Sequence, residues 1–155
     1  MLKLIVAMDA NRGIGLNEKM PWHLPEEMKI FRTLTSGHSV LFGRKTFLGM
    51  GGMLKNRKHY VSTKQSDFKV DGVEVVHNLI AFFKKHEKSD ELIYVSGGAS
   101  IYQQSFPYIQ EAYISVLKES YHCDTFFPDF DLTQFELISK TNYDSFIHYH
   151  YRRKN

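Results

Sequence analysis

Short, almost uninterrupted apolar runs restrict the possible folds of this chain more than any other feature. The first run, Leu2–Met8, ends at the polar residues Asp9 and Asn11. A run of this length that does not alternate apolar with polar residues is typical of a strand covered on both faces. The chain therefore needs helices on both sides of a sheet. Further strands are predicted at residues 39–42, 58–62, 73–76, 92–96 and 112–117.

Two later segments close the predicted sheet. Residues 135–138 and 146–151 have the pattern of antiparallel strands. The 155 residues, 43% of them hydrophobic, fit one compact domain spanning residues 1–155. The fold class is therefore α/β, with a mostly parallel sheet of about eight strands, about four flanking helices and an antiparallel C-terminal strand pair. Residues 11–19 contain two glycines and are expected to form a mobile loop.

The charge and the cysteine content exclude several classes of protein. The chain has 20 Lys and Arg residues against 17 Asp and Glu residues, a balance too mild and too dispersed for a nucleic-acid surface. Cys123 is the single cysteine, so no internal disulfide can form, and a free thiol suits a reducing compartment. The apolar run at residues 2–8 is too short for a signal sequence or a membrane span. We expect a cytoplasmic protein with no nucleic-acid or membrane partner.

A helix is predicted to begin at Pro25, because proline suits the first helical position and Glu26 and Glu27 fall in the first turn. At about 100° per residue, Glu26 points away from the apolar face and Glu27 lies in its middle. An unpaired carboxylate there is costly, so Glu27 is protonated, paired with a core donor, or facing a cleft that binds a ligand. The alternative is that both glutamates are solvated charges. The apolar face consists of Leu24, Ile30, Phe31 and Leu34.

Trp22, the only tryptophan, stands between two prolines just before this helix. Aromatic side chains that carry a polar group commonly form the walls of ligand sites. The alternative is an ordinary core residue.

Turns between predicted strands and helices indicate phosphate binding. Gly43-Arg44-Lys45-Thr46 places two cations and a hydroxyl at a helix N-terminus, and Thr63-Lys64 offers a second such pair after the next strand. Gly97-Gly98-Ala99-Ser100 would let backbone N–H groups approach a pyrophosphate, although the full G-x-G-x-x-G fingerprint is absent. The alternative in each case is a turn that binds no ligand.

Other chemistries lack their motifs. His148 and His150 share one side of a predicted strand, but no further Cys, His or carboxylate lies nearby at a ligand spacing, so no metal site is expected. The sequence has neither a G-x-S-x-G elbow nor a complete P-loop. Nucleophilic catalysis and NTPase activity are therefore not expected.

A series of short motifs runs along almost the whole chain. They are Ile14-Gly15, Met20-Pro21-Trp22-His23-Leu24-Pro25-x-Glu27, Phe31, Gly43-Arg44-Lys45-Thr46, Leu54-x-x-Arg57, Gly97-Gly98-Ala99-x-Ile101-Tyr102 and Asp124-Thr125-Phe126-Phe127-Pro128. In order and spacing they resemble dihydrofolate reductase of the bacterial chromosomal type. The Met-Pro-Trp loop with its acid, together with the downstream double glycine, makes this resemblance specific.

The resemblance implies hydride transfer from NADPH to the pterin ring of 7,8-dihydrofolate, giving tetrahydrofolate. Glu27 would hold the pterin through its 2-amino group and N3 and would favour protonation at N5. Trp22 would position a water near Glu27, Tyr102 would lie beside the nicotinamide, and Ser115 would bond to Glu27 through its hydroxyl. Arg57 would pair with the α-carboxylate of the substrate. The remaining substrate-site residues would be Ile5, Ala7, Met28, Phe31, Arg32, Met50 and Leu54.

The resemblance also assigns the cofactor site. Arg44, Thr63 and Lys64 match the positions that contact the adenosine 2′-phosphate, which predicts NADPH over NADH. The family usually has a cis peptide bond between the two glycines, here Gly97 and Gly98. The full predicted cofactor set is Ala7, Ile14, Gly15, Gly43, Arg44, Lys45, Thr46, Ser62, Thr63, Lys64, Ser96, Gly97, Gly98, Ala99, Ser100, Ile101, Tyr102 and Asp124.

Three segments depart from the family pattern. Residues 49–56 replace the usual Ser-Ile-Gly-x-Pro-Leu-Pro, so both prolines are lost beside the site for the folate tail. Ser100 stands where many members carry a basic or longer polar residue. Residues 141–144 form a shorter connection between the closing strands.

The leading hypothesis is a monomeric NADPH-dependent dihydrofolate reductase. One alternative is an NADPH-dependent reductase of another pteridine or a pyrimidine on the same fold. A second is a non-catalytic nucleotide-binding module, against which Glu27 on the apolar face argues.

Overall fold

The computed structural model describes residues 1–17 and 19–155. Helix α1 begins at Pro25, as the sequence predicted. The elements are β1 (Leu2–Met8), β2 (Gly13–Gly15), α1 (Pro25–Thr35), β3 (Ser39–Gly43), α2 (Arg44–Gly49), β4 (Lys58–Ser62), β5 (Val73–Val76), α3 (Leu79–His86), β6 (Ile93–Val95), α4 (Ala99–Ser105), β7 (Glu111–Leu117), β8 (Thr125–Phe126), η1 (Leu132–Gln134), β9 (Phe135–Asn142) and β10 (Phe146–Arg153).

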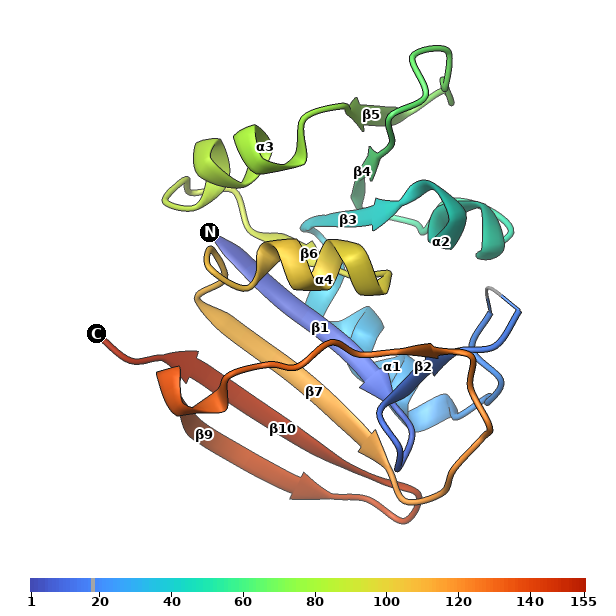
Figure 1. Cartoon of the computed structure of the whole chain (residues 1–155), viewed down its shortest axis with the longest axis vertical. Coiled ribbons are helices and arrows are strands. Elements are labelled where there is room, and N and C mark those ends of the chain that lie inside the picture. Colours follow the sequence, from blue (N-terminus) through green and yellow to red (C-terminus); the bar gives the residue numbers. More distant parts are fainter. Residues whose placement is uncertain (18) are drawn as a thin grey trace.

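Eight strands form the main sheet in the order β5-β4-β3-β6-β1-β7-β10-β9. The six strands β5, β4, β3, β6, β1 and β7 pair with their neighbours in parallel. Strand β10 runs antiparallel to both β7 and β9. Figure 1 shows β1 in the interior of this sheet and β9 at its lower edge. The predicted fold class, a mostly parallel sheet closed by an antiparallel C-terminal pair, is confirmed.

Different helices cover the two faces of the sheet. Leu4 and Val6 of β1 belong to a core cluster that includes residues of α3 and α4, whereas Ile5 packs in a cluster with Phe47 of α2 and against Phe31 of α1. Neighbouring residues of β1 are therefore buried on opposite faces, which explains why this strand is apolar almost throughout. In Figure 1, α4 lies in front of β1 and α1 lies behind it.

Two local predictions were wrong. Part of the predicted loop at residues 11–19 forms the strand β2, which pairs with β8 about one hundred residues further along the chain. Because β2 forms only by pairing with β8, no local sequence pattern predicts it. Glu18, in the same predicted loop, lies outside the described residues. The strand predicted at 135–138 extends to Asn142, which shortens the connection predicted at 141–144 to residues 143–145.

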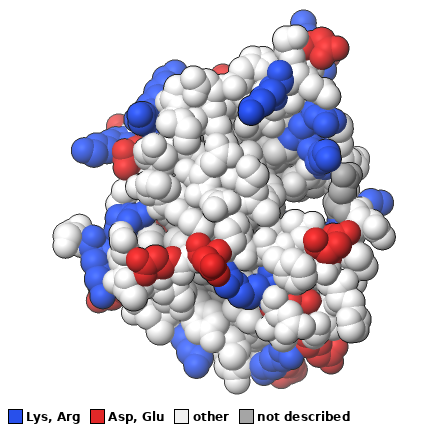
Figure 2. Space-filling view, viewed as in Figure 1, with Lys and Arg blue, Asp and Glu red and all other residues white. Residues whose placement is uncertain are grey.

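The described part of the chain contains no helix with the length and apolar character needed to cross a membrane. On the face drawn in Figure 2, basic and acidic side chains are interspersed, and neither sign forms a continuous stripe.

Candidate active site

The separately predicted motifs meet at one edge of the sheet. Strands β1, β3, β4 and β6 are consecutive parallel neighbours within the order β4-β3-β6-β1. The loop after β1, the start of α2, the turn after β4 and the double glycine after β6 all follow the carboxyl ends of these strands. In open α/β sheets ligands bind in the crevice outside those ends.

Glu27 occupies the buried face of α1 and is only 8% exposed. Burial raises its pKa from 4.5 to about 7. Among the described residues no cation offsets this burial. Glu27 therefore lies in the apolar face of α1, as the helix geometry predicted, and burial holds it between its two protonation states near neutral pH. Glu26, one position earlier, is exposed.

Trp22 is buried beside this acid-bearing helix. Its ring lies 5.4 Å from that of Tyr121, and it shares a small apolar cluster with Ala7 and Leu117. The indole Nε1 is buried and has no hydrogen-bond partner among the described residues. A buried donor without a partner is costly. Trp22 therefore serves as a core residue whose indole N–H makes no hydrogen bond to the described residues.

Tyr102 links α4, on the cofactor side of the site, to β1 beside the acid. It is buried on α4, and its hydroxyl donates a 2.8 Å hydrogen bond to the carbonyl of Ile5 in β1. Burial, and after it the carboxyl of Glu27, raise the pKa of Tyr102. The phenol is therefore neutral and fixed, and it lies within the electrostatic reach of Glu27.

Ser115 has a partner that the sequence did not suggest. Its Oγ lies 3.0 Å from Nδ1 of His148, its cross-strand neighbour on β10. Burial and then the charge of His150 lower the pKa of His148, which favours the neutral ring. The hydroxyl bond from Ser115 to Glu27 that the resemblance implies stays a prediction.

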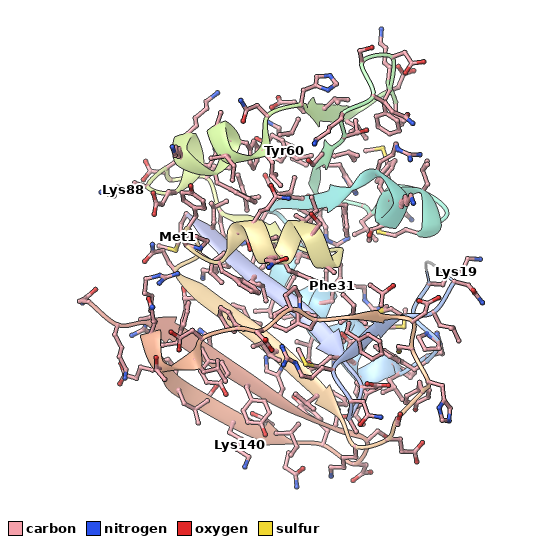
Figure 3. All side chains as sticks on the ribbon, in the orientation of Figure 1. Met1, Lys19, Phe31, Tyr60, Lys88 and Lys140 are labelled. Atoms are coloured by element: carbon pink, nitrogen blue, oxygen red, sulfur yellow. The ribbon has the colours of Figure 1, made fainter. Side chains whose placement is uncertain are left out.

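Four of the predicted substrate residues form an apolar wall, with Arg57 at one end. Ile5, Phe31 and Leu54 pack in one cluster, and Ala7 lies in the adjoining cluster with Trp22. The guanidinium carbon of Arg57 lies 5.9 Å from the Phe31 ring centre. Met28 is half-buried, whereas Arg32 and Met50 are exposed. In Figure 3, Phe31 lies near the middle of the molecule, whereas Lys19 is at its edge.

Glycine backbone forms a close-packed cradle across the sheet edge from Glu27. The N–H of Gly43 donates a 2.8 Å hydrogen bond to the carbonyl of Gly97. A Cβ on Gly43 would lie 3.4 Å from Ile101, and one on Gly98 would lie 3.3 Å from Thr46 Oγ1. The Gly97–Gly98 peptide bond is cis, as the resemblance implied. Gly97 has a φ of 116°, which favours glycine, and a Cβ on Gly98 would press against the Thr46 hydroxyl.

The polar side chains around this cradle differ in how they are held. Arg44 is half-buried at the start of α2, which has no side-chain cap, and Lys64 is exposed. Thr63 is buried and accepts a 3.1 Å hydrogen bond from the N–H of Gln65. Of the other predicted residues here, Ala99 and Ser96 are half-buried, Ser62 ends β4, Lys45 is exposed, and Ser100 Oγ accepts a 2.9 Å hydrogen bond from Gln104.

One further residue reaches this corner of the site. His77 Nδ1 lies 3.0 Å from the carbonyl of Thr63. The only available sequence signal was its position directly after the strand at 73–76.

Two aspartates hold the loop beside the site. Asp124, a predicted cofactor residue, accepts from the N–H of Asn17 at 3.0 Å, and its own N–H donates to the carbonyl of Gly15 at 2.9 Å. Ile14, in the same loop, is half-buried.

Asp9 was missed by sequence reasoning. It is 1% exposed and accepts hydrogen bonds from the N–H groups of Asn11, Gly13 and Tyr121 at 2.7–2.9 Å. Burial acts to raise its pKa, but these hydrogen bonds and one from Cys123 outweigh burial and lower the pKa. No motif pointed to Asp9, because Tyr121 and Cys123, which complete its set of donors, lie more than one hundred positions away.

This arrangement fits a reduced nicotinamide dinucleotide. The backbone of the double glycine precedes a helix N-terminus, Arg44 and Lys64 suit a phosphate, and the Trp22 N–H is buried without a partner among the described residues. An α/β sheet with such a cradle and a buried acid at the carboxyl ends of its strands defines a dinucleotide-dependent enzyme.

Comparisons with known proteins identify which one. The family model described as dihydrofolate reductase matches residues 1–153. A dihydrofolate reductase from Bacillus subtilis (strain 168) is 40% identical over 139 residues, which cover 90% of this chain and 82% of that protein. One from Staphylococcus aureus is 33% identical over 138 residues, covering 89% and 84%. The solved structure of dihydrofolate reductase from Enterococcus faecalis, complexed with NADP(H) and RAB-propyl, superposes with a TM-score of 0.92 at 30% identity, covering 100% of this chain and 97% of that one. The chain belongs to the dihydrofolate reductase family.

Proposed function

We propose that this protein reduces 7,8-dihydrofolate to 5,6,7,8-tetrahydrofolate with NADPH, and that Glu27 is its substrate-binding acid. The single observation that carries the proposal is Glu27, a buried carboxyl with a pKa of about 7 beside an apolar wall at the carboxyl edge of the sheet. A pterin offers the 2-amino group and ring N3 as paired donors to such a carboxyl.

The protein's own groups handle the proton. Near neutral pH Glu27 exchanges between a carboxylate that binds the pterin donors and a neutral acid, and its contact favours the substrate protonated at N5. The buried Trp22 N–H, which has no partner among the described residues, would orient a water close to this carboxyl. Protonation at N5 makes C6 of the pterin a better hydride acceptor.

The cofactor is assigned to the glycine cradle. When bound, NADPH supplies the hydride. Residues 97–101 and the start of α2 would hold its phosphates, with Arg44 and Lys64 at the 2′-phosphate. Tyr102, whose hydroxyl donates to the Ile5 carbonyl, would lie beside the nicotinamide ring.

The substrate tail is assigned to the wall that ends at Arg57. Ile5, Phe31 and Leu54 would contact the p-aminobenzoyl ring. The planar guanidinium of Arg57 suits two parallel hydrogen bonds to the α-carboxylate of the glutamate.

The test is spectrophotometric oxidation of NADPH with dihydrofolate by the wild type, Glu27→Gln and Glu26→Gln. The wild type and Glu26→Gln should turn over at similar rates, because Glu26 is exposed. Glu27→Gln should lose about 10²–10⁴-fold in kcat/KM, the usual contribution of a positioned acid. Equal rates for all three proteins would refute the role of Glu27.

The same assay separates the alternatives. Turnover with another pterin or a pyrimidine but not with dihydrofolate would indicate a different reductase. The altered residues 49–56 are the reason to consider that alternative. Binding of NADPH without any turnover would indicate a nucleotide-binding module.

We propose further that the enzyme is a single domain that acts as a monomer in the cytoplasm. The supports are one eight-stranded main sheet with apolar clusters packed on both of its faces and a single free thiol, Cys123. Sedimentation equilibrium of the purified protein tests the oligomeric state.

A further inference from the structure

The segment that carries the folate-tail residues is weakly packed at its start. Gly51 and Gly52 have φ values of 78° and 152°, and a Cβ at either position would meet nothing within 4 Å. Both prolines usual in the family are missing from residues 49–56. Something else must therefore hold Leu54 and Arg57 in place, because glycine-rich chain has a high conformational entropy to lose.

His59 bridges that segment from inside the core. It is fully buried on β4, with its ring centre 6.4 Å from that of Phe42 and 6.2 Å from that of Phe47. Its Nε2 accepts a 3.1 Å hydrogen bond from the N–H of Leu54, and its Nδ1 lies 3.2 Å from the carbonyl of Arg57. Because a backbone N–H can only donate and a carbonyl can only accept, the ring is neutral with its hydrogen on Nδ1.

The guanidinium of Arg57 is held from the opposite side. Its Nε donates a 2.8 Å hydrogen bond to Oγ1 of Thr35, the last residue of α1, and Nη1 donates to the carbonyl of Lys55 at 3.0 Å. The Thr35 hydroxyl in turn donates to the carbonyl of Phe31 at 2.7 Å. The backbone of Arg57 therefore depends on His59 and its side chain on Thr35.

We infer that His59 is a positioning residue for the tail of the folate substrate: by fixing Leu54 and Arg57 together, it supplies the rigidity that prolines give other family members. This inference rests on the proposed function. The effect is confined to the tail, because Glu27 lies about 12 Å from Thr35 along α1 and belongs to the pterin end of the site.

The surroundings of His59 keep the bridge intact at neutral pH. Burial lowers its pKa, the hydrogen bond to the Arg57 carbonyl opposes this, and the nearby Arg57 charge adds to the lowering. The aromatic and cross-strand neighbours of His59 are uncharged: Phe42 and Val40 on β3, Phe47 on α2 and Val73 on β5. A proton on Nε2 would remove the only acceptor offered to Leu54 N–H by this ring.

The test compares two substrates in the intact enzyme: dihydrofolate, and 7,8-dihydropterin, which lacks the p-aminobenzoyl-glutamate tail. His59→Leu, which removes both hydrogen bonds, should raise KM for dihydrofolate about tenfold and leave kcat within about twofold. The kinetic constants for dihydropterin should not change. His59→Gln, which retains an acceptor for Leu54, should recover most of the affinity for dihydrofolate.

His86→Leu is the matched control, because His86 is also a buried histidine but lies on α3, packed against Tyr60 and Phe82. It should leave KM for both substrates unchanged. If His59→Leu does not fold, His59→Asn tests the Leu54 hydrogen bond alone, because the shorter side chain has no acceptor at the position of Nε2; it should raise KM for dihydrofolate and leave the constants for dihydropterin unchanged.

Equal losses with both substrates, or an unchanged KM for dihydrofolate, would overturn the inference. Failure of the proposed function is a different result: the wild type would not reduce dihydrofolate at all.

Discussion

Replacing Glu27 with glutamine should make the free enzyme more stable at alkaline pH while lowering its kcat/KM. The carboxyl titrates at about 7 in the folded protein and at 4.5 when solvated. Each tenfold step in the protonation equilibrium is worth about 1.4 kcal/mol, so keeping Glu27 ionised above pH 7 costs the folded state about 3 kcal/mol. Glutamine has nearly the same shape and no charge, so the variant avoids that cost.

The sign of the pH dependence follows from proton binding. Between pH 4.5 and about pH 7 the folded protein holds a proton on Glu27 that the unfolded chain has released. The free energy of unfolding therefore falls as the pH rises through this window and is constant above it, as far as this group is concerned. Below pH 4.5 both states are protonated and the cost disappears.

Urea unfolding of wild type, Glu27→Gln and Glu26→Gln without ligands, at about pH 8 and about pH 5, measures the effect. The advantage of Glu27→Gln over the wild type should be about 2.5 kcal/mol larger at pH 8 than at pH 5. Glu26→Gln, which changes an exposed charge on the same turn, should show almost no such difference. An advantage of Glu27→Gln that is the same at both pH values would refute the argument that burial of an unpaired carboxyl raises its pKa.

Three further perturbations test other parts of the site. Asp9→Asn should lower the free energy of unfolding by about 2–4 kcal/mol in urea at pH 7, and the loss should shrink as the pH falls through the lowered folded-state pKa of Asp9; an unchanged midpoint would contradict its role as a loop anchor. Lys64→Gln should raise KM for NADPH several-fold in steady-state kinetics and leave KM for NADH unchanged, and an equal effect on both would exclude a 2′-phosphate contact. Gly97→Ala should cost about 1–3 kcal/mol in thermal unfolding, because its φ of 116° is strained for any residue with a Cβ; a stability equal to that of the wild type would refute this.

Much of the architecture could be predicted because burial of a strand or of one helix face produces a local pattern of apolar residues in the sequence. Strand β1 is apolar at nearly every position since both of its faces are covered, and α1 begins at Pro25 with Glu27 on its buried face. The glycine turns after β3 and β6 were also visible, because close backbone approach excludes side chains. These patterns arise within a few residues and need no knowledge of distant partners.

The polar contacts that complete the site left no such record. Asp9 meets the N–H of Tyr121, 112 positions away, and Ser115 meets His148 only because β7 and β10 pair in that register. Strand β2 exists because β8 lies beside it. Their physical cause is the spatial alignment of donors and acceptors from separate segments, which depends on strand register and packing across the whole sheet.

The sequence by itself determined the fold class, the family and an acid in the apolar face of one helix, because periodicity and motif spacing encode burial locally. Tertiary structure alone decided how strongly that acid is perturbed, and which groups hold the loops around it. His59 shows the distinction. Its place in β4 is predicted by the strand pattern, but its hydrogen bonds to Leu54 and Arg57 depend on how β4 packs against the segment that precedes it. Desolvation and hydrogen-bond geometry are properties of the packed molecule, so no window of sequence contains them.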